Sequence, residues 1–218
     1  AEAATRLAAA GIRFASLTNG SLLCGEAAAV FSQAGSWLRV SMDGWDGPSY
    51  ARYRGVDEDA FGRVVGNIKA FKRLGGPCRL GVSCIVDRDN AAHVSTLISR
   101  FRDAGADSVK ISPCIVANEG RDNNAYHAPL LDLVKEQTAR AQATLAGDDF
   151  EIFDAYHLLE EKFDKPYHWC PYQQILPVIG ADARLYSCQD KAYNLDSGLL
   201  GSLEGVRFKE LWQADKER

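Results

Sequence analysis

No run of apolar residues in this chain of 218 approaches the length of a membrane span, and the alanine-rich start lacks the basic, leucine-rich layout of a signal peptide. Neither sign of charge dominates, because 25 Lys and Arg stand against 29 Asp and Glu for a net charge of -4. Phosphate binding needs a basic surface, so nucleic acid is disfavoured as a partner. We therefore expect a cytoplasmic protein with no nucleic-acid or membrane partner.

The sequence also lacks any CxxC pair. Its six cysteines are too dispersed, in too large a chain, to form the disulfide framework of a small secreted domain. We expect mostly free thiols, some of which could bind a metal. The cysteines stand at positions 24, 78, 84, 114, 170 and 188.

What remains is the composition of an ordinary globular protein, 46% hydrophobic and 25% charged. The length allows one large core, or one domain with a small appendage. The chain begins at Ala1 with a helical segment, residues 2–10, that leads directly into a strand. This start indicates a domain taken from a longer protein.

Four β-type runs end in polar or turn residues, and helical periodicity follows each of them. This alternation predicts an α/β fold with parallel strands and about four βα units in residues 1–146. A loop over residues 44–56 and a polar loop over residues 118–124 interrupt the pattern, and Asp57 is a plausible helix N-cap. The strands are expected within residues 14–20, 38–44, 79–87 and 108–116, and the helices within 22–34, 57–74, 89–104 and 128–145.

The strands alternate in character, with one apolar side and one small, polar or charged side. Arg39, Ser41 and Asp43 share the polar side of the second strand, and Lys110 lies on the polar side of the fourth. Parallel strands covered on both faces are usually apolar throughout. We therefore expect helices on one face and a polar cavity on the other, as in a partial (β/α) barrel.

The pattern changes after residue 147. A short strand is predicted at 150–153, two short β runs at 174–179 and 183–187 form a hairpin around a Gly-Ala-Asp turn, and a last helix lies within 203–212. Cys170 enters this hairpin and Cys188 leaves it. Residues 147–218 are thus predicted to be a small, hairpin-containing C-terminal extension.

Some residues point to chemistry without any family resemblance. Ser41 and Asp43 lie at the carboxyl end of a strand, where α/β sheets and barrels bind ligands. Lys110 could form a Schiff base, pair with Asp43 or bind an acidic group of a substrate. Cys170 and Cys188 could converge on one metal or cluster, although a full site needs about four ligands.

Together the motifs resemble the later part of a radical S-adenosylmethionine enzyme. TNGSLL resembles the third barrel strand and its turn, and LRVSMDG with YARYRG resembles the fourth strand and its loop. GVSCIVDRDN and VKISPCIV resemble the fifth and sixth strands. The resemblance covers roughly residues 1–145 as barrel. WCPYQQILPVIGADARLYSCQDKAY then resembles the opening of a SPASM or twitch extension, which holds an auxiliary iron–sulfur cluster.

The resemblance implies a parent enzyme that cleaves S-adenosylmethionine reductively and abstracts hydrogen from a substrate. It places five residues near the cofactor: Asn19, Ser41, Asp43, Arg54 and Asn90. It makes Cys170 and Cys188 the first ligands of an auxiliary 4Fe–4S cluster. The CxxxCxxC loop that holds the primary cluster in this family is absent from the sequence. We therefore expect a fragment that is inactive without the remainder of its parent chain.

Two other classes of function stay open. One is a small aldolase-type enzyme that uses Lys110 as a Schiff-base nucleophile. The other is a non-catalytic module that binds zinc through Cys170, Cys188 and His168. A peptide, a sugar or a small metabolite would each be compatible with a polar barrel interior.

Overall fold

The structure, a computed structural model, describes residues 1–117, 120–157, 170, 175–193 and 195–213. The chain divides into two compact units, Ala1–Asp164 and Lys165–Arg218, and each is built around a sheet of its own. None of the helices in the described ranges is both long and apolar enough to cross a membrane.

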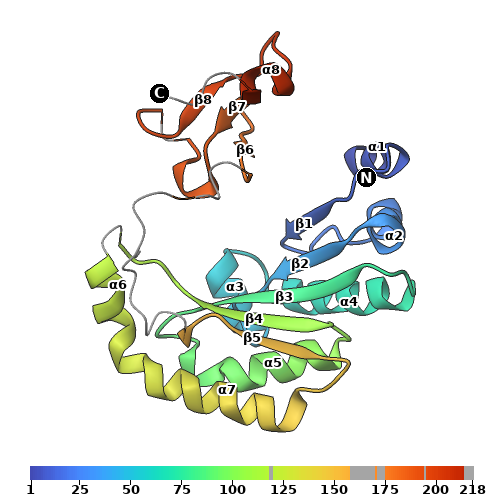
Figure 1. Ribbon diagram of the computed structural model, residues 1–218. Coiled ribbons are helices and arrows are strands. Elements are labelled where there is room, and N and C mark those ends of the chain that lie inside the picture. Colours follow the sequence, from blue (N-terminus) through green and yellow to red (C-terminus); the bar gives the residue numbers. More distant parts are fainter. Residues whose placement is uncertain (118–119, 158–169, 171–174, 194, 214–218) are drawn as a thin grey trace. The chain divides into compact units, whose positions relative to one another are not determined.

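The first unit contains a five-stranded sheet in which every neighbouring pair of strands is parallel. The strands lie side by side in chain order: β1 (Ala15–Thr18), β2 (Trp37–Ser41), β3 (Arg79–Val86), β4 (Ser108–Pro113) and β5 (Glu151–Asp154). Helical segments connect them, as Figure 1 shows. These are α2 (Gly25–Ala34), α3 (Gly47–Arg54), α4 (Asp59–Arg73), α5 (Val94–Asp103), α6 (Gly120–His127) and α7 (Leu131–Leu145), with α1 (Glu2–Ala9) before β1 and single 3-10 turns at Ala91–His93 and Ala128–Leu130.

The core lies on one face of this sheet. Alternate side chains of β2 and of the residue after it, Leu38, Val40 and Met42, are at most 2% exposed. They pack against helices on the same face, where α4 contributes apolar residues such as Ile68 and Phe71 at helical spacing. Burying one such side chain is worth about 1.5–3 kcal/mol. Figure 1 shows α4, α5 and α7 together on this side of the sheet.

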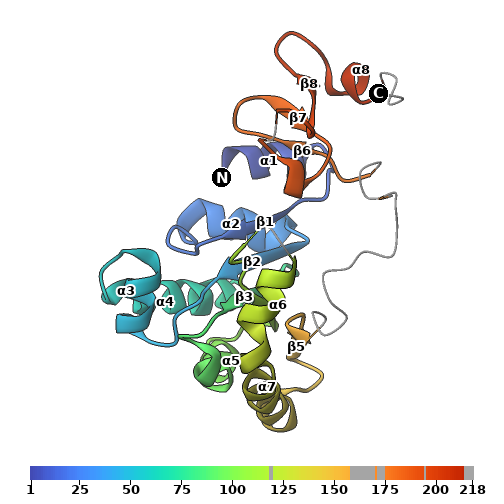
Figure 2. The same ribbon diagram turned by 90° about the vertical axis from the view of Figure 1, so that its left-hand side faces the viewer.

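The opposite face of the sheet carries the polar half of the alternation and is open. Leu17, Ile85 and Phe153 are 69%, 37% and 42% exposed there, and Ser41 and Lys110 are half-buried. A parallel sheet with helices on one side only is a partial barrel. This confirms the predicted α/β class and the one-sided arrangement of helices, which Figure 2 shows from a second direction.

Two segments predicted as loops contain helices. Helix α3 occupies most of residues 44–56, and α6 overlaps the predicted polar loop at 118–124. The N-cap prediction was also wrong, because α4 begins at Asp59 with Glu58 as its N-cap. The Asp57 carboxylate instead accepts hydrogen bonds from both terminal nitrogens of Arg63, each at 2.8 Å.

The short strand predicted near residue 150 belongs to the main sheet. β5 pairs in parallel with β4, with Lys110 opposite Phe153. The first compact unit therefore continues past the expected boundary at residue 146 and ends at Asp164.

The second unit contains a three-stranded antiparallel sheet in the order β6-β7-β8. β6 (Val178–Ile179) and β7 (Arg184–Tyr186) form the predicted hairpin, and β8 (Leu199–Ser202) adds to β7. A 3-10 turn at Gln189–Lys191 follows Cys188. Helix α8 (Phe208–Gln213) begins inside the range 203–212 predicted for the last helix and ends one residue beyond it. The hairpin turn is held by Asp182, whose carboxylate accepts from the Tyr186 hydroxyl at 2.6 Å.

Candidate functional site

The carboxyl end of β2 carries a cluster of three polar side chains. Ser41 is the last residue of β2 and Asp43 follows two positions later. A terminal nitrogen of Arg54 donates to the Asp43 carboxylate at 2.6 Å and to the Ser41 hydroxyl at 3.1 Å. The structure thus brings together three of the five residues predicted near a cofactor.

Arg54 reaches this position because of how α3 begins and ends. Asp46 and Ser49 form a capping box at its start, since each side chain bonds the backbone N–H of the other. Gly55, at φ 64°, ends the helix in the left-handed conformation that glycine adopts most readily. Gly44 lets α3 approach β2, because a Cβ there would lie 2.5 Å from Tyr50 backbone atoms. The placement of Arg54 therefore depends on the capping residues of α3 and on the close approach that Gly44 allows.

The Asp43 carboxylate is the best-held group of the cluster. One oxygen binds Arg54, and the other accepts from the Ile85 backbone N–H at 2.9 Å. Its side chain is only 14% exposed. Burial raises the pKa of Asp43, and the Ile85 N–H and the Arg54 charge only partly offset this effect.

Asn90 supports the cluster from beneath rather than facing a ligand. Its side-chain nitrogen donates to the carbonyl oxygens of Asp43 at 3.1 Å and Ile85 at 2.8 Å. Its oxygen accepts from the Asp87 backbone N–H at 2.9 Å, and the residue is 1% exposed. Both amide hydrogens are thereby used, so Asn90 positions the backbone that carries Asp43.

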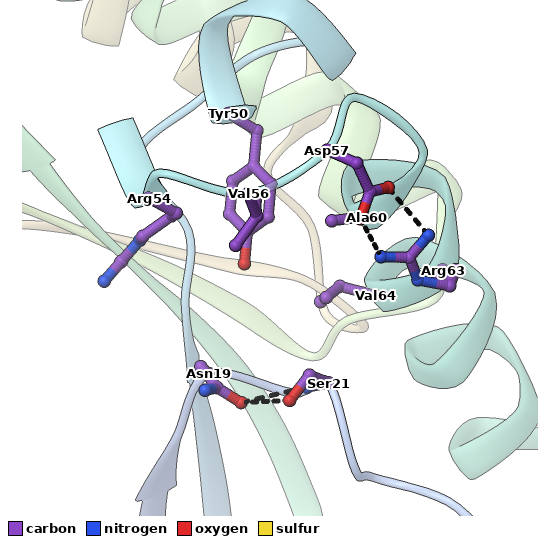
Figure 3. Close-up of a pocket in the computed structure, with 9 residues that line it drawn as sticks. All are labelled: Asn19, Ser21, Tyr50, Arg54, Val56, Asp57, Ala60, Arg63 and Val64. Carbon is purple, nitrogen blue, oxygen red and sulfur yellow. Dashed lines mark hydrogen bonds and ion pairs between the residues drawn. The ribbon is translucent and has the colours of Figure 1, made fainter. Parts of the chain in front are cut away.

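Asn19 lies after β1, beside a pocket of about 370 Å³. Its side-chain oxygen accepts from the backbone N–H of Ser21 at 3.0 Å and from the Ser21 hydroxyl at 2.8 Å. The intervening Gly20 has φ 76°, and a Cβ there would meet Val40 at 2.8 Å, so the turn requires glycine. Figure 3 shows the pocket, which is lined by Asn19, Ser21, Tyr50, Arg54, Val56, Asp57, Ala60, Arg63 and Val64.

Several lining residues were not anticipated from sequence. One of them is Tyr50, which lies four residues before the predicted Arg54, so the two share a face of α3 in a segment predicted to be a loop. The Asp57–Arg63 ion pair joins a helix to the segment before it. Helical spacing of Tyr50 and Arg54 was the signal that could have identified this wall.

Lys110 projects from the open face of the sheet, half-buried, in register with Ser83 and Phe153. Of the three alternatives for Lys110, the ion pair with Asp43 is not found among the described residues, where Asp43 is paired with Arg54. Lys110 thus stays available to a ligand.

The cysteines form no metal site in the described part of the chain, where no group of three or more metal-ligating side chains occurs. Cys170 and Cys188 are both half-buried and free. His168 lies outside the described residues. Cys84 is a buried core thiol that donates to the Met42 carbonyl oxygen at 2.8 Å, and burial raises its thiol pKa.

Comparisons with solved structures give the fold but no family assignment. No protein-family model matches the sequence, and no curated protein matches it. SuiB of Streptococcus suis bound to S-adenosylmethionine superposes with a TM-score of 0.70 at 14% identity, over 99% of this chain and 51% of SuiB. SuiB bound to its precursor peptide SuiA gives 0.66 at 13% identity, over 99% and 51%. The protein anSMEcpe with bound AdoMet gives 0.57 at 20% identity, over 94% and 57%.

The chain therefore spans about half the length of the structures it matches. The shared fold is the parallel partial barrel with its helices on one face, followed by a small antiparallel sheet. At these identities the likeness establishes the fold alone.

The cluster suits S-adenosylmethionine in its donor set. The ligand carries a carboxylate, an ammonium group and a ribose diol, and the site offers a guanidinium, a carboxylate and a hydroxyl beside a pocket of suitable size. An iron–sulfur cluster is not accommodated in the same way. It needs about four thiolates, and the sequence has no CxxxCxxC loop, while Cys170 and Cys188 supply two thiols.

Proposed function

We propose that this chain forms the S-adenosylmethionine-binding and substrate-facing part of a radical S-adenosylmethionine enzyme. The observation that carries the proposal is the Ser41–Asp43–Arg54 cluster at the carboxyl edge of a parallel sheet that is open on one face. Solved structures of the same fold contain S-adenosylmethionine. When bound, this cofactor supplies a carbon radical that abstracts a hydrogen atom from the substrate.

Arg54 is the residue we expect to bind the cofactor's carboxylate. A guanidinium binds a carboxylate through parallel N–H donors, and Arg54 is 30% exposed in its side chain, so it can turn toward the pocket. The Asp43 carboxylate and Ser41 hydroxyl are then free to accept from, or donate to, the ribose hydroxyls and the ammonium group. Asn90 holds Asp43 in place throughout, and Asn19 closes the pocket at the end of β1.

The electron that cleaves the cofactor would come from a reduced iron–sulfur cluster whose ligands lie outside these 218 residues, because the CxxxCxxC loop is absent from them. We propose the second unit as the beginning of a SPASM or twitch-like extension, with Cys170 and Cys188 as its first ligands. Its hairpin followed by Cys188 supports this assignment.

A peptide is the substrate class with most support. Structures of the same fold contain a precursor peptide in SuiB and a peptide in anSMEcpe. The open face with its mixed polar and apolar side chains is compatible with a peptide. Sugars and small metabolites remain alternatives for the binding assays to separate.

Binding of S-adenosylmethionine to the 218-residue chain tests the proposal by nuclear magnetic resonance. We expect shifts at Asn19, Ser41, Asp43 and Arg54. Replacing Arg54 by Gln should weaken binding by about tenfold or more, as expected for a lost hydrogen bond between charged groups. Arg52→Gln is the matched control, because Arg52 lies on the same helix with its guanidinium over Trp45 and does not line the pocket. Equal losses in both variants, or shifts confined to another region, would refute the assignment.

A further inference from the structure

The centre of the open sheet face is a shallow strip of small, hydroxyl-bearing residues. Ser41 is in register with Ser83, and Ser83 with Lys110. One row toward the amino ends, Arg39 is in register with Gly81, and Gly81 with Ser108. Two long cationic side chains therefore flank a strip whose other side chains are short.

Two other arginines near this strip have a carboxylate partner. Arg54 pairs with Asp43, and Arg79 lies 3.9 Å from Glu151. Within the described ranges, neither Arg39 nor Lys110 lies within ion-pair distance of a carboxylate. Arg39 instead lies over the ring of Trp37, 5.4 Å from its centroid.

The charged ends of Arg39 and Lys110 can meet over the strip. From the register and the ordinary strand spacing, their Cα atoms are about 12 Å apart along the diagonal. Arg39 extends along the neighbouring strand β3, because its Nε lies 3.7 Å from the position that a Cβ on Gly81 would take. Since Gly81 has no side chain, a ligand group can approach the sheet between the two cations.

Apolar side chains border the strip. Leu17 on one edge strand and Phe153 on the other are exposed, and Ile85 is exposed toward the carboxyl ends of the strands. Unneutralised cations beside each other repel, and this repulsion is relieved when an anion binds between them. The arrangement fits a ligand that has a negative group next to an apolar one.

We propose that Arg39 and Lys110 bind a carboxylate of the molecule on which the enzyme acts, while Phe153 and Ile85 contact its apolar part. The proposal rests on the proposed function only in taking this face as the substrate side. A free organic acid and an acidic side chain of a peptide present the same chemistry to these two residues.

Nuclear magnetic resonance titration of the ¹⁵N-labelled chain tests the proposal without S-adenosylmethionine. The probes are a capped Gly-Glu-Phe-Gly peptide, its glutamine counterpart, and succinate. At about 10 mM probe, ten times a Kd of about 1 mM, the acidic peptide or succinate should shift the signals of Ser83 and Lys110. Succinate alone would indicate a small acid, and the glutamate peptide would indicate a peptide carboxylate; either result supports the proposal.

Lys110→Met should weaken binding of the acidic probe about tenfold, to the level of the glutamine peptide. Lys69→Met is the matched control, because Lys69 is exposed on α4, and it should bind as the unmodified chain does. Arg39→Gln provides a second test if the first variant fails to give a dispersed spectrum. Equal binding of the glutamate and glutamine peptides without any succinate-dependent shift, no charge-dependent shift with any probe, or unchanged affinity in folded variants would overturn the proposal. Arg54→Gln should leave peptide binding intact, so loss of the cofactor site is distinguishable from loss of this one.

Discussion

Asn90 offers the most direct test of how the site is held. Its amide joins three backbone groups from two strand ends, the carbonyl oxygens of Asp43 and Ile85 and the N–H of Asp87. Replacement by Ala removes all three hydrogen bonds at a position that is 1% exposed. Water cannot readily take the place of the lost partners, so each buried group left unsatisfied costs about 1–3 kcal/mol.

Allowing for relaxation of the loop, the expected loss in the free energy of unfolding of the first unit is about 2–4 kcal/mol. For a chain of this size that corresponds to a fall in Tm of about 5–12 °C. N90D keeps the acceptor for the Asp87 N–H but loses both donors, and its carboxylate would face two carbonyl oxygens. We expect N90D to be at least as unstable as N90A at neutral pH and to recover partly in acid, where protonation restores one donor.

Urea and thermal unfolding followed by circular dichroism measure these differences. Asp89→Ala is the control, because Asp89 is exposed beside Asn90 and should change stability by no more than about 0.5 kcal/mol. If N90A were as stable as D89A, Asn90 would not be holding the strand ends, and our account of how Asp43 is positioned would be wrong.

Four further outcomes follow from the same structure. Burial raises the folded-state pKa of Asp43 above 3.8, so the contribution of its protonated form to stability is fully present below pH 3.8 and is lost as the pH rises through the folded-state pKa. In unfolding titrations, the stability of the unmodified chain relative to D43N should therefore decline as the pH rises from 3.8 through that pKa, and an increase would contradict the role of burial. Gly44→Ala should destabilise by about 2 kcal/mol or more in urea unfolding, since its Cβ would lie 2.5 Å from the backbone of α3, and a neutral effect would exclude the close approach. Borohydride treatment with a carbonyl substrate should leave Lys110 unmodified in mass spectra, whereas trapping would favour the aldolase-type alternative. Anaerobic iron–sulfur reconstitution of this chain should yield no 5′-deoxyadenosine, and stoichiometric zinc lost on replacing Cys170 and Cys188 would instead favour the metal-binding module.

Local features explain which predictions from sequence were confirmed. Strand alternation such as Leu38–Asp43 has a period of two that is visible in the sequence, and it gave the covered and open faces correctly. The hairpin around residues 180–183 was equally readable from its turn residues. Helix α3 was harder to predict, because apart from the spacing of Tyr50 and Arg54 its residues show little amphipathic periodicity, and its capping box pairs Asp46 with Ser49 rather than with Glu or Gln.

The candidate site likewise has features that could be predicted from sequence and features that could not. The sequence by itself determined that Ser41 and Asp43 share one side of a strand end, and family resemblance added Asn19, Arg54 and Asn90 as neighbours of a cofactor. Only the tertiary structure decided their separate roles, because hydrogen bonds across 11 to 47 residues cannot be read from spacing. Arg54 binds the Asp43 carboxylate directly, and Asn90 donates both amide hydrogens to the backbone carbonyl oxygens of Asp43 and Ile85. Lys110 therefore does not pair with Asp43. Strand alternation can be read from the sequence because its period is two residues, whereas residues that become hydrogen-bond partners only on folding depend on how helices and strand ends pack.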